Sequence, residues 1–173
     1  MSHDAGRGVP CAADGGADHE ALYAAERAAF DGTDLEQLRE FAELRALVDA
    51  VTSGHWWPGP RVAMRAARAD ALSSRAVEVP SGSEIRLAGP QLTTATAAHE
   101  LAHALAGVRA GHGPTYRRAL LDVVEVITNH DPTDRRRLLH VDQLSVAFAD
   151  AGLAVGQRRW PPPPASLSGP IAL

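Results

Sequence analysis

The segment from His99 to His103, with the sequence HELAH, combines residue types and a spacing that suit metal chemistry. Residues four apart on an α-helix lie on one face with Cβ atoms about 5–6 Å apart, so the imidazoles of His99 and His103 can converge on one ion. They would supply two ligands of a tetrahedral zinc site. Glu100 lies about 100° around the helix from His99, where it can reach a water at the metal. We therefore expect His99 and His103 to bind zinc and Glu100 to act as general acid and base.

A third ligand must come from outside this pair, and the sequence excludes one class of site. Metzincins have a glycine and a histidine three and six positions after the second histidine. Here these positions hold Ala106 and Arg109. A gluzincin-like site would instead take a carboxylate from a later helix, for which Asp122 and Glu125 are the candidates. That alternative stays open.

His112 is better placed to be the third ligand. Gly107 can end the helix that carries the motif, and residues 108–111 allow the chain to turn back. A glycine on each side of His112 lets its backbone approach the metal closely. Asp122 or Glu125 would then accept a hydrogen bond from the second ring nitrogen of a liganding imidazole. Three histidines with an open fourth position are typical of catalytic rather than structural zinc.

The composition narrows the chemistry further. The 173 residues include 17 arginines, no lysine and a single cysteine, Cys11. Without lysine there is no Gly-Lys-Ser/Thr phosphate loop and no Schiff base, and one cysteine excludes an internal disulfide and a cysteine-built zinc ribbon. The net charge of -4 provides no overall field toward nucleic acid or an acidic membrane. A metal must therefore bind to His, Asp or Glu.

The elements expected around the motif form an α+β domain with helices before and after a small sheet. Helix-forming composition predicts a helix over residues 18–31, and helical periodicity predicts a second over 34–52, capped by Thr33 or Asp34. Alternating apolar residues predict three short strands in an antiparallel or mixed sheet, with the last two joined as a hairpin; they are expected within 61–68, 77–79 and 85–87. The metal-binding helix is expected over 92–106, followed by one that starts near Pro114 and one over 134–152.

We expect a single domain, residues 18–155, between two flexible tails. Residues 1–17 are rich in Gly, Ala and Asp, and residues 156–173 contain four consecutive prolines. The first residues lack the pattern of a signal peptide, and no apolar run approaches the roughly 18 residues of a membrane span. The expected location is therefore the cytoplasm, away from membranes. No oligomeric state can be inferred.

The stretch from His99 to Tyr116 resembles the SprT-like zinc metallopeptidases. Their pattern is His-Glu-x-x-His followed by a third histidine that opens a His-Gly-x-x-aromatic segment, and here eight residues separate His103 from the sequence HGPTY at His112. The stretch is most similar to a family of zinc metallohydrolases of mycobacteria and other actinobacteria with a His-Gly-Pro-x-Phe/Tyr segment. The resemblance implies a small zincin-like fold, His99, His103 and His112 as zinc ligands, and Glu100 as the catalytic acid/base.

The resemblance also implies a peptide or protein substrate, with two departures. The cysteine zinc ribbon of many SprT-like proteins cannot form here, and no DNA-binding module is evident, which argues against repair of DNA–protein crosslinks. The arginines at 117–118 and 135–137 lie among acidic residues, so we favour a solvated helix face over a nucleic-acid site.

Three further points stay open. Tyr116 is either a donor to the oxyanion or a packing residue. The strand at 85–87 is either an edge that aligns an extended peptide or an ordinary edge strand. The alternative to an enzyme is a non-catalytic, zinc-stabilised interaction domain with the same three ligands, which would require a fourth protein ligand.

Overall fold

The computed structural model describes residues 16–129 and 139–164, which form five α-helices and three strands. Two helices come first, α1 (Gly16–Phe30) and α2 (Phe41–Ser53). The strands follow as β1 (Val62–Ala66), β2 (Arg75–Val79) and β3 (Gly82–Leu87). The remaining helices are α3 (Thr94–Ala106), α4 (Pro114–Thr128) and α5 (Leu139–Asp150). The predicted α+β class, with helices before and after a small sheet, is confirmed.

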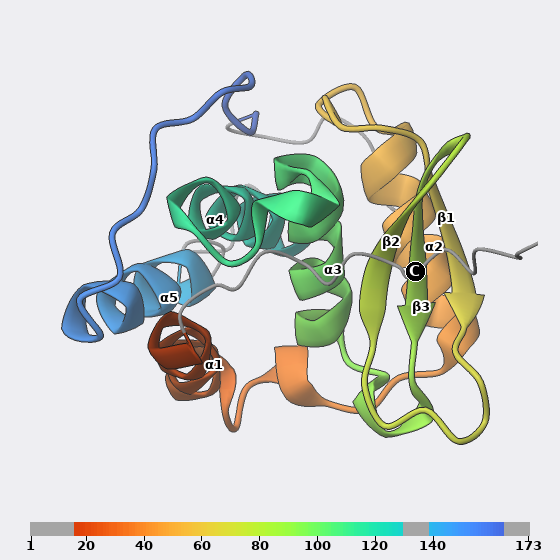
Figure 1. Ribbon diagram of the computed structural model, residues 1–173, viewed down its shortest axis with the longest axis horizontal. Helices are drawn as coiled ribbons and strands as arrows, with labels where there is room; N and C mark the ends of the chain where they lie inside the picture. The colour runs from red at the N-terminus through yellow and green to blue at the C-terminus, as the bar shows by residue number, and fades with distance from the viewer. Residues whose placement is uncertain (1–15, 130–138, 165–173) are drawn as a thin grey trace, which may run out of the picture.

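Helix α3, which carries the HELAH segment, lies at the centre of the fold. The sheet and α2 lie on one side of it, and α1, α4 and α5 lie on the other (Figure 1). Four of its alanines are at most 2% exposed: Ala97, Ala98, Ala102 and Ala104. Their small side chains let neighbouring elements pack closely against the helix on both sides. The helix is therefore held rigidly, as a metal site requires.

Both ends of α3 have a defined cap. The Thr93 side chain accepts a hydrogen bond from the backbone N–H of Thr96 at 3.1 Å, which satisfies one of the free donors of the first turn. At the other end the chain leaves the helix at Gly107, whose φ of 96° is strained for any residue with a Cβ. The prediction that Gly107 ends this helix is confirmed.

The sheet is mixed, and its strand order is β1-β3-β2. Strands β2 and β3 form the predicted antiparallel hairpin, whereas β1 pairs with β3 in parallel. Strand β3 is therefore central and is paired on both sides. The prediction of an edge at residues 85–87 is wrong, because the parallel pairing of β1 covers the second side of β3. Strand β2 is at an edge of the sheet, and it packs against α3.

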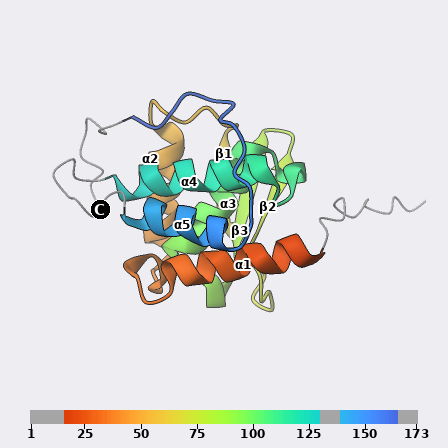
Figure 2. The same ribbon diagram turned by 90° about the vertical axis from the view of Figure 1, so that its left-hand side faces the viewer.

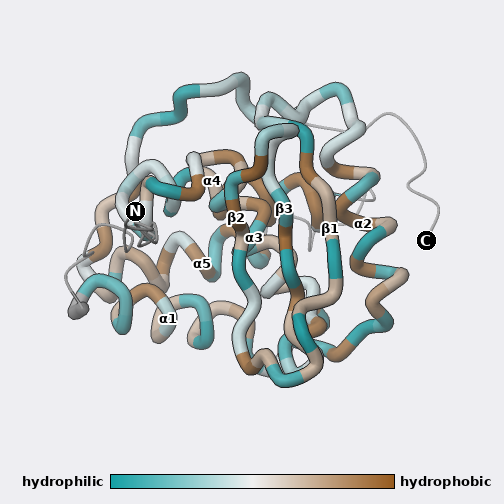
Figure 3. The backbone as a smooth tube through the Cα atoms, turned by 45° about the vertical axis from the view of Figure 1, so that its right-hand side comes forward, coloured by the Kyte–Doolittle hydropathy of each residue, from teal (hydrophilic) through white to brown (hydrophobic). Residues whose placement is uncertain are grey.

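Helices α1, α4 and α5 form a layer beside α3. They lie roughly alongside one another (Figure 2). Apolar side chains from all three are completely buried in one core: Leu22, Leu120, Val123, Leu144 and Phe148. Hydrophilic residues lie along the outer turns of α1 and α2 (Figure 3). Burial of the apolar faces holds α1 against the rest of the fold.

The second helix begins later than predicted. Thr33 caps a short 3-10 helix, Asp34–Glu36, instead of the long helix. Leu38 then forms an isolated antiparallel bridge with Thr93, and Glu40 starts α2 with a capping box. The pairing with the start of α3 keeps residues 37–39 extended. Thr33 is therefore a helix cap, as predicted, but it caps the short 3-10 helix and not α2.

The chain beyond α5 remains packed on the domain. Residues 156–164, expected as part of a flexible tail, run along α4 (Figure 2). The carbonyl of Gly156 accepts a hydrogen bond from Arg118, and the indole of Trp56 donates to the carbonyl of Pro161 at 2.9 Å. The packed part of the chain therefore extends to residue 164. The rest of that predicted tail, residues 165–173, and nearly all of the predicted N-terminal tail lie outside the described residues.

Candidate metal centre

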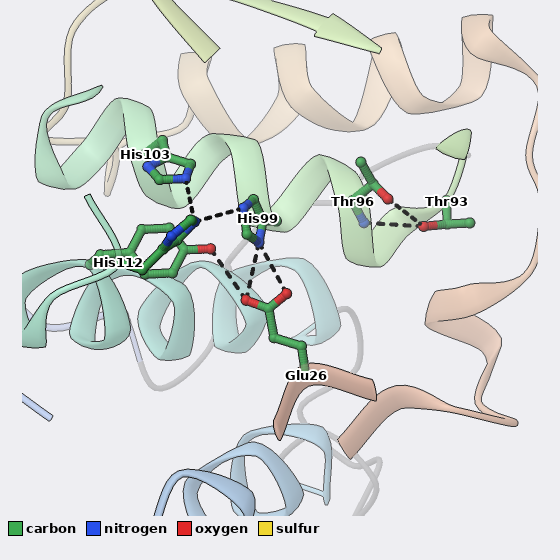
Figure 4. Close-up of polar contacts among 7 residues, drawn as sticks. Glu26, Thr93, Thr96, His99, His103 and His112 are labelled. Atoms are coloured by element: carbon green, nitrogen blue, oxygen red, sulfur yellow. Dashed lines mark hydrogen bonds and ion pairs between the residues drawn. The ribbon is translucent and has the colours of Figure 1, made fainter. Parts of the chain in front are cut away.

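The three histidines expected to bind metal come together in the structure. His99 and His103 lie one turn apart on α3, and His112 lies in the short connection between α3 and α4. Their ligand atoms are all within 4.8 Å of one another, and the three residues could hold a metal ion. The Nε2 atom of His112 lies 3.1 Å from Nε2 of His103 and 3.3 Å from Nε2 of His99 (Figure 4).

These separations fit the donor set of a zinc site. Zinc binds imidazole nitrogen at about 2.0–2.1 Å, so two nitrogens of a tetrahedral site are about 3.3–3.4 Å apart. The two Nε2 separations, 3.1 and 3.3 Å, are close to that value. The chemistry of the donors agrees as well, because neutral imidazole is a preferred ligand of zinc and of other borderline metals.

His112 reaches the other two histidines because the connection turns twice through glycine. After Gly107, a 3-10 helix covers Val108–Ala110, and Gly111 follows with φ 58° and ψ -152°. A residue with a Cβ rarely adopts such a conformation. Pro114 then starts α4, as predicted. The glycine on each side of the short helix lets the chain bring His112 back toward the face of α3.

Glu26 is the carboxylate that orients the site, and sequence reasoning missed it. Both of its carboxylate oxygens lie 3.0 Å from Nδ1 of His99 (Figure 4). A carboxylate only accepts hydrogen bonds, so Nδ1 of His99 carries a proton, and in the neutral ring Nε2 keeps its lone pair for a metal. Glu26 lies on α1, and its side chain is only 13% exposed.

Helix α1 presents a row of three polar residues to the histidines. His19, Tyr23 and Glu26 have the spacing i, i+4, i+7 of one helix face. The Tyr23 ring stacks on His99 at a centroid distance of 5.4 Å and meets His112 edge-on at 5.6 Å. The exposed ring of His19 lies 5.0 Å from His112. This periodicity of polar residues is the signal in the sequence that could have indicated a functional face.

Tyr116 packs beneath the histidines and does not face solvent. Its side chain is fully buried, and its ring lies 4.4 Å from His103 and 5.3 Å from His99. Its hydroxyl donates to Oε1 of Glu26 at 3.3 Å. Of the two roles considered for Tyr116, oxyanion donor and packing residue, this buried position agrees with packing. The hydroxyl also supports the carboxylate of Glu26. Tyr23, the other tyrosine of the chain, is only partly buried.

Asp122 and Glu125, the carboxylates considered from the sequence, lie farther along α4. Asp122 is 1% exposed, and its two oxygens accept hydrogen bonds from Arg158 at 2.7 and 2.8 Å and from the indole of Trp160 at 2.8 Å. This carboxylate holds the C-terminal segment and not a histidine. The charge of Glu125, one turn further, helps to raise the pKa of Arg158. The residue that takes the role expected of them is Glu26.

Glu100 lies on α3, on the side that packs against the edge strand β2. It is 5% exposed and accepts a hydrogen bond from the backbone N–H of Ala76. Burial raises the pKa of Glu100, and the nearby charge of Glu26 adds to this effect, while His99 and the Ala76 hydrogen bond lower it. The net shift is upward. The carboxyl group of Glu100 is therefore close to the three histidines but does not belong to the group of possible metal ligands.

His99 and His103 differ in their affinity for protons. Burial lowers the pKa of His99, but Glu26 and Glu100 outweigh it and the net shift is upward. Burial, together with the charges of His99 and His112, lowers the pKa of His103 to about 2. His103 is therefore neutral at physiological pH, the form in which an imidazole binds metal.

Comparison of the chain with protein-family models, with curated proteins and with solved structures finds no match. The likeness to SprT-like and actinobacterial zinc metallohydrolases therefore stays a prediction that depends on the motif alone. Among the residues that the structure describes, no helix is both long enough and apolar enough to cross a membrane.

Proposed function

We propose that this protein is a zinc-dependent hydrolase and that it cleaves peptide bonds. The observation that carries the proposal is the convergence of His99, His103 and His112, with two Nε2 separations of 3.1 and 3.3 Å and with the buried carboxylate of Glu100 next to His99. Zinc held by these three residues would lower the pKa of a water toward about 7 and would polarise a peptide carbonyl.

Each surrounding residue has a role in this proposal. Glu100 accepts a proton from the attacking water and returns it to the leaving amine. Glu26 accepts the Nδ1 proton of His99 and thereby fixes the orientation of that ring. Tyr116 donates to Glu26 and keeps its carboxylate in place.

Tyr23 is the phenol available to a substrate. Tyr116 is fully buried and committed to Glu26, whereas Tyr23 is partly exposed and lies against the rings of His99 and His112. We assign to Tyr23 the role of hydrogen-bond donor to the oxygen that becomes negative during attack. An extended peptide would lie near β2, the edge strand that packs against α3.

One observation favours a second candidate function, a non-catalytic zinc domain. A structural site needs four protein ligands, and His19 lies with its ring centroid 5.0 Å from that of His112. That distance is similar to the 4.7 and 5.2 Å between His112 and the other two histidines. However, His19 does not belong to the group whose ligand atoms all lie within 4.8 Å, and it is exposed. The three-histidine site with Glu100 is therefore the better supported arrangement.

The decisive experiment combines metal analysis with cleavage of casein or a peptide library. Wild type and Glu100→Gln should each contain about one zinc per chain, while His112→Ala should lose it. Only wild type should cleave. Bound zinc without cleavage that depends on Glu100 would support the non-catalytic domain.

A second comparison in the same assay tests the gluzincin-like alternative. If His112→Ala kept its zinc and Glu125→Ala lost it, a carboxylate would be the third ligand. Absence of zinc from the wild-type protein after loading would refute both the enzyme and the zinc-stabilised domain.

A further inference from the structure

One buried guanidinium joins the candidate metal centre to the C-terminal segment. Arg117 lies in the first turn of α4 and is 3% exposed. Its NH1 group donates to the backbone carbonyl of His112 at 3.0 Å, and its Nε group donates to the carbonyl of Ala154 at 2.7 Å. The same side chain therefore holds the backbone of the third ligand and the backbone beyond α5.

A second contact brings the C-terminal segment against the residues next to His112. The N–H of Gly156 donates to the carbonyl of Pro114 at 2.8 Å. A Cβ at Gly156 would lie 2.9 Å from both the carbonyl carbon and the oxygen of Pro114, closer than real Cβ atoms approach backbone. Only glycine allows the segment to come this close to the start of α4.

The segment from Leu153 to Pro164, which we call the C-terminal strap, is fastened along its length. Asp122 binds both Arg158 and Trp160, and Asn129 donates to the carbonyl of Pro164 at 3.1 Å. These bonds fix the strap to α4 at points beyond Gly156. A buried guanidinium that loses one of its hydrogen-bond acceptors is left partly unpaired, which costs free energy. Movement of the strap at Ala154 would therefore also disturb Arg117.

His112 depends on such support more than the other two histidines do. His99 and His103 are fixed by the hydrogen bonds of α3, but His112 lies in a connection that is not α-helical, just after the left-handed Gly111. Its backbone position is therefore set by tertiary contacts. The contacts described here include Arg117 at its own carbonyl and, two residues on, Gly156 against Pro114.

The geometry points to Arg117 as a positioning residue through which the C-terminal strap controls the affinity of the three-histidine site for metal. This inference depends on the metal site of the proposed function but not on its hydrolytic activity. A docked strap holds His112 where its Nε2 meets those of His99 and His103. Displacement of the strap moves His112 and weakens metal binding, so the C-terminal segment is a point at which the site can be regulated.

The test uses the full-length chain and two matched glycine substitutions. Gly156→Ala pushes the strap away from Pro114. Gly89→Ala is the control, because Gly89 is exposed, has no positive φ, as Gly156 has none, and its added Cβ would meet nothing within 4 Å. Zinc affinity is measured by competition with a chromophoric chelator, and the melting temperature of the zinc-free protein is measured in parallel. We expect Gly156→Ala to weaken zinc binding by about tenfold and Gly89→Ala to leave the zinc affinity within about twofold of wild type.

Arg117→Gln provides the second variant and should weaken zinc binding by at least as much as Gly156→Ala does. Arg117→Lys should not restore the affinity, because a single ammonium cannot reproduce the guanidinium fork. If the variants melt earlier but bind zinc as tightly as wild type, the strap is only a stabilising element and the inference is refuted. Zinc binding that responds to the strap in a protein that cleaves nothing would refute the proposed enzyme while leaving this inference standing.

Discussion

Replacing Glu26 by glutamine should weaken zinc binding by about 10- to 100-fold, which corresponds to about 1.4–2.8 kcal/mol. Both carboxylate oxygens of Glu26 lie 3.0 Å from Nδ1 of His99, and the side chain is mostly buried, so its charge acts directly on the imidazole. Glutamine keeps the shape and one acceptor oxygen but loses the negative charge. The imidazole of His99 would be held less firmly, and its Nε2 would donate its lone pair to the metal less strongly. Competition with a chromophoric chelator measures the change.

The matched control is Glu20→Gln on the same helix. Glu20 is exposed and does not share the helix face of His19, Tyr23 and Glu26, so this variant changes the net charge equally without touching His99. Its zinc affinity should equal that of wild type. The reasoning is refuted if Glu26→Gln binds zinc as tightly as wild type, or if Glu20→Gln loses as much affinity, because the effect would then be one of overall charge.

Three further outcomes follow from the contacts. Tyr23→Phe should lower kcat by about 10²-fold with little change in KM, whereas Tyr116→Phe should keep kcat within a few-fold; equal losses in steady-state assays would contradict the assignment of Tyr23. The upward pKa shift of Glu100 means that the folded chain keeps this proton to a higher pH than the unfolded chain, so folding stability falls as the pH rises from 4.5 through the folded pKa and stays lower above it. Glu100→Gln should therefore raise the melting temperature of the zinc-free protein by about 2–4 °C at pH 7, and this gain should vanish below pH 4.5 in thermal scans. Thr93→Ala, which removes the cap of α3, should cost about 1 kcal/mol in denaturant unfolding, and an unchanged midpoint would show that the cap contributes nothing.

Local patterns made the cluster of three histidines predictable. His99 and His103 are four residues apart on a helix, so their shared face follows from helix geometry alone. His112 comes only nine positions after His103, and the glycines between them show where the chain must turn. The short loop leaves few conformations in which His112 points elsewhere, and for this reason its position could be inferred without the fold.

Glu26 could not be found in the same way because it meets His99 across 73 positions of sequence. Its helix has the composition of a scaffold element, and packing of α1 against α5 decides which face turns toward the site. The sequence indicates Asp122 and Glu125 instead, because a gluzincin-like site takes its carboxylate from a later helix. Tertiary packing, which sequence spacing does not encode, determines that Asp122 instead binds Arg158 and Trp160.

Two other features escaped prediction for related reasons. The hairpin of β2 and β3 is local and could be foreseen, but the parallel pairing of β1 with β3 joins strands that are not adjacent along the chain. The C-terminal strap has no helical or strand periodicity, and its prolines resemble a linker. It is attached by individual polar contacts, such as that of Trp56 with Pro161, and by the packing of Leu153, Val155 and Trp160 on the core. No pattern in the sequence predicts these contacts.

Zinc K-edge X-ray absorption of the zinc-loaded protein would test the central claim most directly. A catalytic site formed by His99, His103 and His112 predicts three imidazole nitrogens at about 2.0–2.1 Å and one oxygen from solvent in the fourth position. His19→Ala should leave that spectrum unchanged. Four imidazoles in wild type, reduced to three in His19→Ala, would show a closed structural site and would contradict the proposal that this protein is a zinc hydrolase.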